Sequence, residues 1–162
     1  MTTIEKKLVN VGKYVNNAHV DSLIRNYKKE RWIFNSERIG KEDALSSWYT
    51  VDELQEFMDR VQMHGADGIR FYFGAYSADY SDKPEYAGRQ TFVMVATRSK
   101  QVGGELVHKD VYITDNNGAP KILAYNTGMM CPPFCPPPGG GLHRSSLGVT
   151  VIDRGEKGMS II

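Results

Sequence analysis

The chain has 162 residues, of which 41% are hydrophobic, and twenty basic residues against nineteen acidic ones leave a formal net charge of +1. This composition is typical of one globular domain that is long enough to bury a core without disulfides or metals. A net charge near zero argues against a partner that is recognised through the charge of the whole surface, such as duplex DNA. No apolar run approaches the ~20 residues that cross a bilayer, and the first residues do not resemble a secretory signal. We therefore expect a cytoplasmic protein that does not enter the membrane.

Two helices are expected in the first 36 residues. Residues 3–17 place apolar side chains on one narrow stripe at helical spacing, and these are Ile4, Leu8, Val11 and Val15. Such a stripe suits a helix that packs within the chain or docks on a partner. Residues 19–36 form the second expected helix, and Asn16 and Asn17 mark the break between the two.

One side of the second expected helix brings Arg25, Lys28 and Trp32 close together. Basic groups beside an indole can stack on a base or hold a phosphate. A nucleic-acid surface usually comes with an excess of positive charge, which this chain lacks. The patch is therefore interpreted as a solvated face with a packed tryptophan, and nucleic acid is not expected as a partner.

Residues 50–76 contain the clearest local pattern of the chain. Thr50 and Glu53 have the spacing of a capping box, which predicts a helix over 51–64 that ends before Gly65. Its core-facing stripe comprises Val51, Leu54, Phe57, Met58 and Val61.

The period then changes to two, which predicts a strand over 69–76. One face of this strand carries Ile69, Phe71, Phe73 and Ala75, and the other carries Arg70, Tyr72, Gly74 and Tyr76. We expect Phe57 and Phe71 to share the core between helix and strand, and the polar-aromatic face to carry any function of the sheet.

The segments SWYTVDELQEF, GADGIRFYFGAY and QTFVMVATR, within residues 47–98, resemble a family of small uncharacterised bacterial proteins. That family combines an ELxxF helix, a GIRxYFGxY strand and a following TxxxVxT strand. The resemblance supports the predicted helix and strands and implies a bacterial protein. It implies no activity, because none is established for such proteins.

Three further strands are expected over 91–98, 106–114 and 121–126, with a turn at Asp115–Gly118 between the last two. Together these elements predict an α+β fold, with an antiparallel sheet of about four to five strands and two or three helices packed mainly on one face. Residues 1–130 would form this single domain. Residues 131–162 would form a tail rich in proline and glycine, with a possible edge strand over 147–153.

The motif CPPFC and a later histidine form a candidate metal site. Cys131 and Cys135 can supply two thiolate ligands to zinc, and His143 can supply a third. Structural zinc sites usually show two pairs of ligands, and only one pair is visible here. Two incidental free thiols are therefore expected and no cofactor, while zinc and a disulfide or redox role remain the alternatives.

A second candidate site lies on the polar-aromatic face of the sheet and comprises Arg70, Tyr72, Tyr76, His108 and Asp110. An arginine among tyrosines, with a histidine and an aspartate nearby, can bind a small anion or a carboxylate, and the His–Asp pair can act as a general base. The preferred interpretation is structural: Arg70 pairs with Asp110 and the tyrosines cover a minor core.

The chain contains no recognisable nucleophile motif, phosphate-binding loop or complete metal cluster. The leading functional hypothesis is therefore a non-catalytic module that binds another protein or itself, through its N-terminal helix or an exposed sheet face. The alternative is a zinc- or anion-binding protein, possibly an enzyme, that uses one of the two candidate sites.

Overall fold

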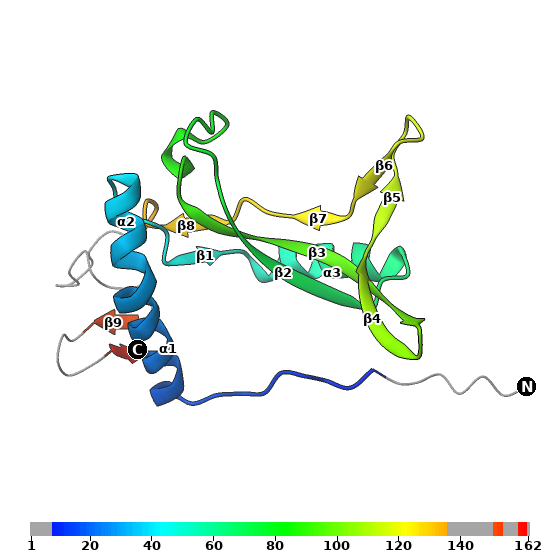
Figure 1. Cartoon of the computed structure of the whole chain (residues 1–162), viewed down its shortest axis with the longest axis horizontal. Helices are drawn as coiled ribbons and strands as arrows, with labels where there is room; N and C mark the ends of the chain where they lie inside the picture. Colours follow the sequence, from blue (N-terminus) through cyan, green and yellow to red (C-terminus); the bar gives the residue numbers. More distant parts are fainter. Residues whose placement is uncertain (1–7, 136–150, 154–158, 162) are drawn as a thin grey trace, which may run out of the picture.

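The computed structural model describes residues 8–135, 151–153 and 159–161. A long strand, β3 (Gln90–Val102), lies at the centre of the main sheet (Figure 1). β2 (Gly68–Ala75) pairs antiparallel with one side of β3 along its whole length. The other side of β3 takes β4 (Glu105–Asp110) and then β7 (Ala124–Tyr125), both antiparallel. The expected α+β class with an antiparallel sheet is confirmed, and this sheet has four strands.

Three short pairs of antiparallel strands complete the strand inventory of the described residues. They are β1 (Ser46–Trp48) with β8 (Met129–Cys131), β5 (Tyr112–Thr114) with β6 (Pro120–Ile122), and β9 (Val151–Asp153) with β10 (Met159–Ile161). β9 falls within the predicted edge strand 147–153, of which residues 147–150 lie outside the described part of the chain. β1 was not predicted, since three residues are too few to show a period of two.

The N-terminal half contains a continuous helical rod and one separate helix. The rod consists of α1 (Asn17–Tyr27), a π-helical turn η1 (Lys28–Trp32) and α2 (Ile33–Ile39), and the separate helix is α3 (Val51–Met63). The rod begins where Asn16 accepts a hydrogen bond from the His19 amide at 3.0 Å, and it ends at Gly40 with a φ of 71°. It stands at one end of the sheet, across the strand direction (Figure 1).

The predicted helix over 3–17 is wrong for residues 8–16, which form no helix; residues 3–7 lie outside the described part of the chain. β-branched valines and Gly12 favour the helix weakly, and a narrow apolar stripe stabilises a helix only if something packs on it. Val11 and Tyr14 are fully exposed, so no segment among the described residues packs on this stripe. Asn16 therefore acts as the start of the next helix rather than as a break between two helices.

α3 follows the sequence prediction closely. The Glu53 amide donates to the Thr50 hydroxyl at 3.0 Å and the Thr50 amide donates to the Glu53 carboxylate at 2.7 Å, which is the expected capping box. Gly65, at a φ of 71°, closes the far end.

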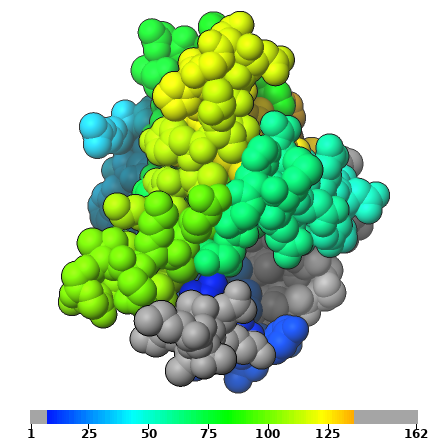
Figure 2. Space-filling view, turned by 90° about the vertical axis from the view of Figure 1, so that its right-hand side faces the viewer, coloured from blue at the N-terminus to red at the C-terminus, as the bar shows by residue number. Residues whose placement is uncertain are grey.

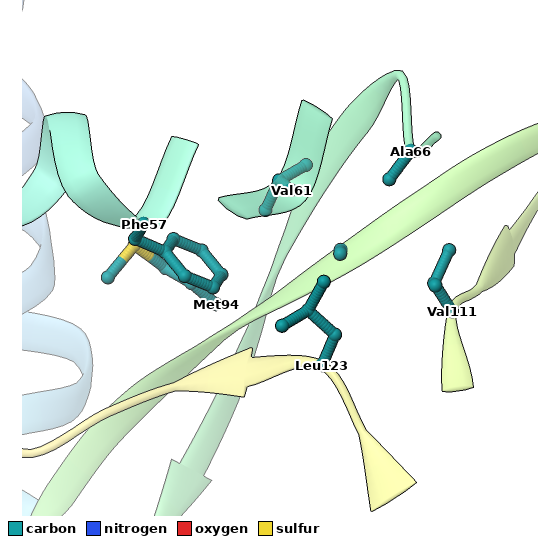
Figure 3. Packing of buried hydrophobic residues seen from close by; sticks show 7 residues of the cluster. Phe57, Val61, Ala66, Met94, Val111 and Leu123 are labelled. Carbon is teal, nitrogen blue, oxygen red and sulfur yellow. The ribbon is translucent and has the colours of Figure 1, made fainter. Parts of the chain in front are cut away.

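The main core lies between α3 and the sheet (Figure 3). It is formed by Phe57, Val61, Ala66, Met94, Ala96, Val111 and Leu123. In Figure 2, side chains of α3 also lie beside the β5–β6 hairpin, with which they line a shallow groove. The predicted stripe is correct at Phe57 and Val61, and Leu54 packs against the core, but Val51 is 81% exposed and Met58 is 40% exposed.

The prediction that Phe71 belongs to the core is wrong. Phe71 is 55% exposed and Phe73 is 87% exposed, whereas Ile69 on the same face packs against the core. The buried partners of α3 come from β3, from Val111 and from Leu123 beside β7, so the helix lies over the centre of the sheet and leaves most of β2 uncovered. A period of two identifies the face of a strand, but it does not show how far the helix above it reaches.

The predicted strand over 106–114 is interrupted at Val111, where the chain leaves β4 and enters the β5–β6 hairpin. The Val111 amide donates to the Ala96 carbonyl at 2.9 Å, and the Val111 carbonyl accepts from the Leu123 amide at 3.0 Å. The predicted strand over 121–126 is likewise divided, between β6 and β7. The predicted turn is present, since the Asp115 carboxylate accepts from the amides of Asn117 and Ala119.

Within the described ranges, none of the helices is both long and apolar enough to cross a membrane.

Candidate functional site

β2 forms an open edge of the main sheet. Its inner side pairs with β3, and no other strand of the described residues pairs with its outer side. The Tyr76 amide donates to the Arg89 carbonyl at 3.0 Å. Since hydrogen-bonded pairs alternate along an antiparallel ladder, residues 70, 72 and 74 bond to β3, and the N–H and C=O groups of Ile69, Phe71 and Phe73 point outward. This edge therefore offers both unpaired backbone groups and exposed aromatic rings.

Among the described residues, β2 itself carries few of the usual protections of an edge strand, although residues 8–12 share a groove with Gly68, Ile69 and Arg70 at its start. Natural edges are commonly guarded by lysines, prolines, bulges or inward charges. β2 contains one charged residue, Arg70, and pairs with β3 over eight consecutive positions without a bulge. An edge that remains long, regular and apolar is suited to accept another strand.

An apolar groove continues from the edge toward the helical rod. It has a volume of about 240 Å³. Its lining includes Tyr27, Leu45, Phe73, Phe92 and Met130. The ring of Phe73, the most exposed of the aromatic side chains on β2, borders it. A side chain that follows a strand added to β2 would find an apolar site here.

On the opposite face of the sheet, the structure brings together four of the five predicted ligand-binding residues. Arg70 Nη1 lies 2.7 Å from Asp110 Oδ1, and Arg70 Nη2 donates to the His108 carbonyl at 2.6 Å. The Tyr72 hydroxyl accepts from Arg70 at 3.0 Å and donates to Asp110 Oδ2 at 2.7 Å. These bonds join β2 to β4 across β3.

The contacts of Arg70 favour the structural interpretation over anion binding. The hydrogen bond to Tyr72 is the main cause that raises the pKa of the Arg70 guanidinium, and the charge of Asp110 adds to it. Asp110 already neutralises the charge of the arginine, and the Tyr72 hydroxyl hydrogen-bonds both Arg70 and Asp110. A small anion would therefore have to displace an internal carboxylate.

The sequence suggested that His108 and Asp110 act together as a general base, but the His108 side chain contacts Ser99 and not Asp110. His108 Nδ1 lies 2.8 Å from the Ser99 hydroxyl, and that hydroxyl also lies 3.2 Å from the Asp67 carboxylate. These groups border an open groove of about 620 Å³ between residues 8–12 and the sheet. A serine nucleophile needs a histidine that a carboxylate orients. In the described part of the chain Asp67 contacts the serine instead.

Tyr76, the fifth predicted residue, lies apart from the Arg70 group. Its hydroxyl donates to Asn126 at 2.8 Å, and its ring stacks on Tyr80 with centroids 4.5 Å apart. Both tyrosines cover a second small core of Ala44, Tyr86 and Met130. This arrangement matches the predicted minor core, although Arg70 and Tyr72 do not belong to it.

Cys131 and Cys135 form a disulfide, so the expectation of two free thiols is wrong. Sulfur atoms that are bonded to each other cannot act as the thiolate ligands that zinc requires, and His143 lies outside the described residues. Spacing alone could not distinguish the three alternatives. Disulfides are rare in the reducing cytosol, so this bond weighs against the cytoplasmic location, which stays a prediction.

In the patch of Arg25, Lys28 and Trp32, the tryptophan is not available to stack on a base. The Trp32 indole N–H donates to the Asp43 carbonyl at 2.8 Å, and the ring is half-buried. Trp32 therefore packs the rod against the following loop, as the preferred interpretation of Arg25, Lys28 and Trp32 expects.

Asp43 is a structural residue that sequence reasoning missed. It is 2% exposed, and its carboxylate accepts from the amides of Ala44 at 2.8 Å and Gln90 at 2.6 Å and from the Asn35 side chain at 3.1 Å. The nearby Arg89 is also buried, and burial lowers the pKa of its guanidinium. An acidic residue in a polar segment gives no signal of such burial.

The geometry defines this chain as an α+β domain whose most distinctive surface is an open, aromatic sheet edge. Comparisons with protein-family models, with curated proteins and with solved structures found no match to the chain. The resemblance to the bacterial family with the GIRxYFGxY strand therefore stays a proposal.

Proposed function

We propose that this chain is a non-catalytic protein-interaction module, which binds an extended segment of a partner by adding it as a strand to the outer side of β2. The observation that carries the proposal is the outer side of β2, where the backbone groups of residues 69, 71 and 73 pair with no strand of the described residues and Phe71 and Phe73 are exposed. Backbone hydrogen bonds would supply affinity, and pockets beside alternate side chains would supply specificity.

The side-chain arrangement supports an extended partner more than a helical one. Phe71 and Phe73 lie two residues apart on one face, so a strand beside them presents alternate side chains at the same spacing. The apolar groove beside Phe73 can receive one of these side chains. The partner segment that fits best is therefore short, uncharged and rich in apolar residues at alternate positions.

The experiment is a selection from a displayed library of random ten-residue peptides, followed by NMR mapping of the selected peptides on the labelled full chain. We expect the amide signals of Ile69, Phe71 and Phe73 to shift most, and binding to fall at least tenfold in Phe73→Lys. The control is Tyr112→Lys, which alters an exposed aromatic residue in β5. Selected peptides that map away from β2, or that bind Phe73→Lys unchanged, would contradict the proposal.

A further inference from the structure

We propose that the segment that occupies the open edge is β2 of a second copy of this chain, paired antiparallel about a twofold axis at Phe71. This inference rests on the proposed function, because it names the partner of the same edge. The resulting dimer has one continuous sheet that runs through both copies.

The backbone of β2 is complementary to itself. The outward N–H and C=O groups belong to residues 69, 71 and 73, which are all odd-numbered. A twofold axis through Phe71 sets Phe71 against its own copy, and sets Ile69 against Phe73 of the second copy and Phe73 against its Ile69. Each of these pairs can exchange the hydrogen bonds of an antiparallel ladder. The interface is isologous, as in most dimers.

The side chains favour this register over its neighbours. Ile69, Phe71 and Phe73 lie on the face of the sheet that α3 covers, so the pairs across the axis are entirely apolar. A twofold axis at Tyr72 would set Phe71 against Phe73, but it would also set Ile69 against Ala75 and Arg70 against Gly74, which has no side chain for the arginine to contact. The axis at Phe71 instead keeps each of Ile69, Phe71 and Phe73 opposite a large apolar side chain.

The charge pattern excludes the opposite shift. Arg70 is the one charged residue of β2. An axis at Arg70 would bring two guanidinium groups together, which is unfavourable for directly opposed residues. With the axis at Phe71, each Arg70 lies across from Tyr72 of the second copy. Within one copy, Arg70 already lies 5.6 Å from the centroid of the Tyr72 ring, so the same cation–π contact can form across the axis.

The exposed area indicates a weak dimer. Phe71, Tyr72 and Phe73 are 55%, 40% and 87% exposed, which corresponds to about 350 Å² per copy at roughly 200 Å² for each aromatic side chain. Two copies would contribute about 700 Å² from these side chains, and the edge backbone adds to it. The side-chain area lies below the ~1,200 Å² at which standard specific interfaces begin, and the edge backbone raises it only into the range of weak, transient contacts, so we expect a dissociation constant in the high-micromolar range.

The first test is sedimentation velocity of the full chain from about 5 to 500 µM. We expect the mass to rise from 18.2 kDa toward twice that value. Phe71→Lys and Phe73→Lys should weaken association at least tenfold, because lysines in the edge oppose strand addition, and Tyr112→Lys should associate like the wild type. Phe71 contacts the Phe92 ring, so circular dichroism must show that each variant folds. If Phe71→Lys does not fold, the more exposed Phe73 carries the test.

The second test determines the register. A nitroxide on Ser77→Cys can be placed selectively because the native cysteines are bonded to each other. Moving the axis from Phe71 to Tyr72 shortens the distance between the two labels by about 7 Å at 3.4 Å per residue. The distance for an axis at Phe71 is the expected result, and any other register overturns the proposed axis.

The extended residues 8–16 offer a different occupant, since Val11 and Tyr14 are uncovered. Deletion of residues 1–15 should leave association unchanged. A dimer that dissociates on this deletion but persists in both lysine variants would overturn the inference, as would a wild type that stays monomeric throughout. If either result is obtained but the selected peptides still bind β2, the dimer is ruled out and the proposed function stands. If they do not, the proposed function fails as well.

Discussion

A carboxylate can be buried at little cost only where donors surround it, and Asp43 meets this condition with donors from three segments. Asn35 contributes from α2, Ala44 from the following loop and Gln90 from the start of β3. The backbone of Asp43 is also held, since its amide donates to Ser36 and its carbonyl accepts from Trp32. This one residue connects the helical rod to the central strand.

We expect Asp43→Asn to lower the free energy of unfolding by about 2–4 kcal/mol, because the amide group that replaces one oxygen would face donors and leave a buried partner unsatisfied. Chemical denaturation monitored by circular dichroism measures the change. The matched control is Asp79→Asn, in an exposed loop. Its free energy of unfolding should stay within about 0.5 kcal/mol of the wild-type value. Equal losses in both variants would mean that Asp43 has no special role.

Glu53 links the stability of α3 to pH. The hydrogen bond from the Thr50 amide is the main cause that lowers the pKa of Glu53 below the ordinary value of a glutamate, and the hydrogen bond from the Tyr125 hydroxyl contributes. Because the pKa in the folded state is below that of the unfolded state, the contribution is present above the unfolded pKa. It is lost as the pH falls through the folded pKa.

Glu53→Gln should therefore destabilise the protein at pH 7, and the difference from the wild type should disappear as the pH falls through the lowered pKa of Glu53. Thermal unfolding of both proteins between pH 2.5 and 7 measures this convergence. Glu56→Gln, one turn further along α3, is the control and should show no such convergence. A constant difference between Glu53→Gln and the wild type across this range would show that the charge is not what stabilises the cap.

At the scale of elements, the disulfide secures the end of β8. Cys131 is buried beside the small core of Tyr86 and Met130, and β8 pairs with β1. The Phe134 ring packs edge-on against Tyr86 with centroids 5.7 Å apart. The bond therefore keeps the PPF segment folded back on this core.

We expect the double variant Cys131→Ser/Cys135→Ser to lose about 2 kcal/mol of stability, the value that loop-closure entropy gives for so short a loop. Urea denaturation of the double variant, and of the wild type with and without a reductant, measures the effect. The reductant should change the wild type and leave the double variant unaffected. Full stability of the reduced wild type would show that the disulfide has no structural role.

At the scale of the whole molecule, local patterns predicted elements better than they predicted contacts. The capping box of Thr50 and Glu53, the turn at Asp115 and the strand predicted over 91–98 follow from neighbouring residues and are present. The exposure of Phe71 depends on where α3 crosses the sheet, and the break at Val111 depends on Leu123. Neither is encoded in the segment itself.

The candidate site shows the same division. The face shared by Arg70, Tyr72 and Asp110 follows from strand alternation, and their contact is present. Strand alternation places Tyr76 on the same face, but its ring packs against Tyr80 and Tyr86 of the following loop and not against Arg70. The open edge could not be predicted from the β2 segment, because it depends on the order of the strands in the sheet. In the described part of the chain, no strand pairs with the outer side of β2.

The order of the strands along the chain has a consequence for protein synthesis. When β2 and β3 have left the ribosome, they form a hairpin that is open on both sides, and such edges favour aggregation during folding. β4 and β7 emerge later and cover the free side of β3. The side of β2 is not covered by any described strand that follows. Among the described strands, those that follow β3 thus cover one of the two edges of the hairpin, and the outer side of β2 stays accessible after they have formed.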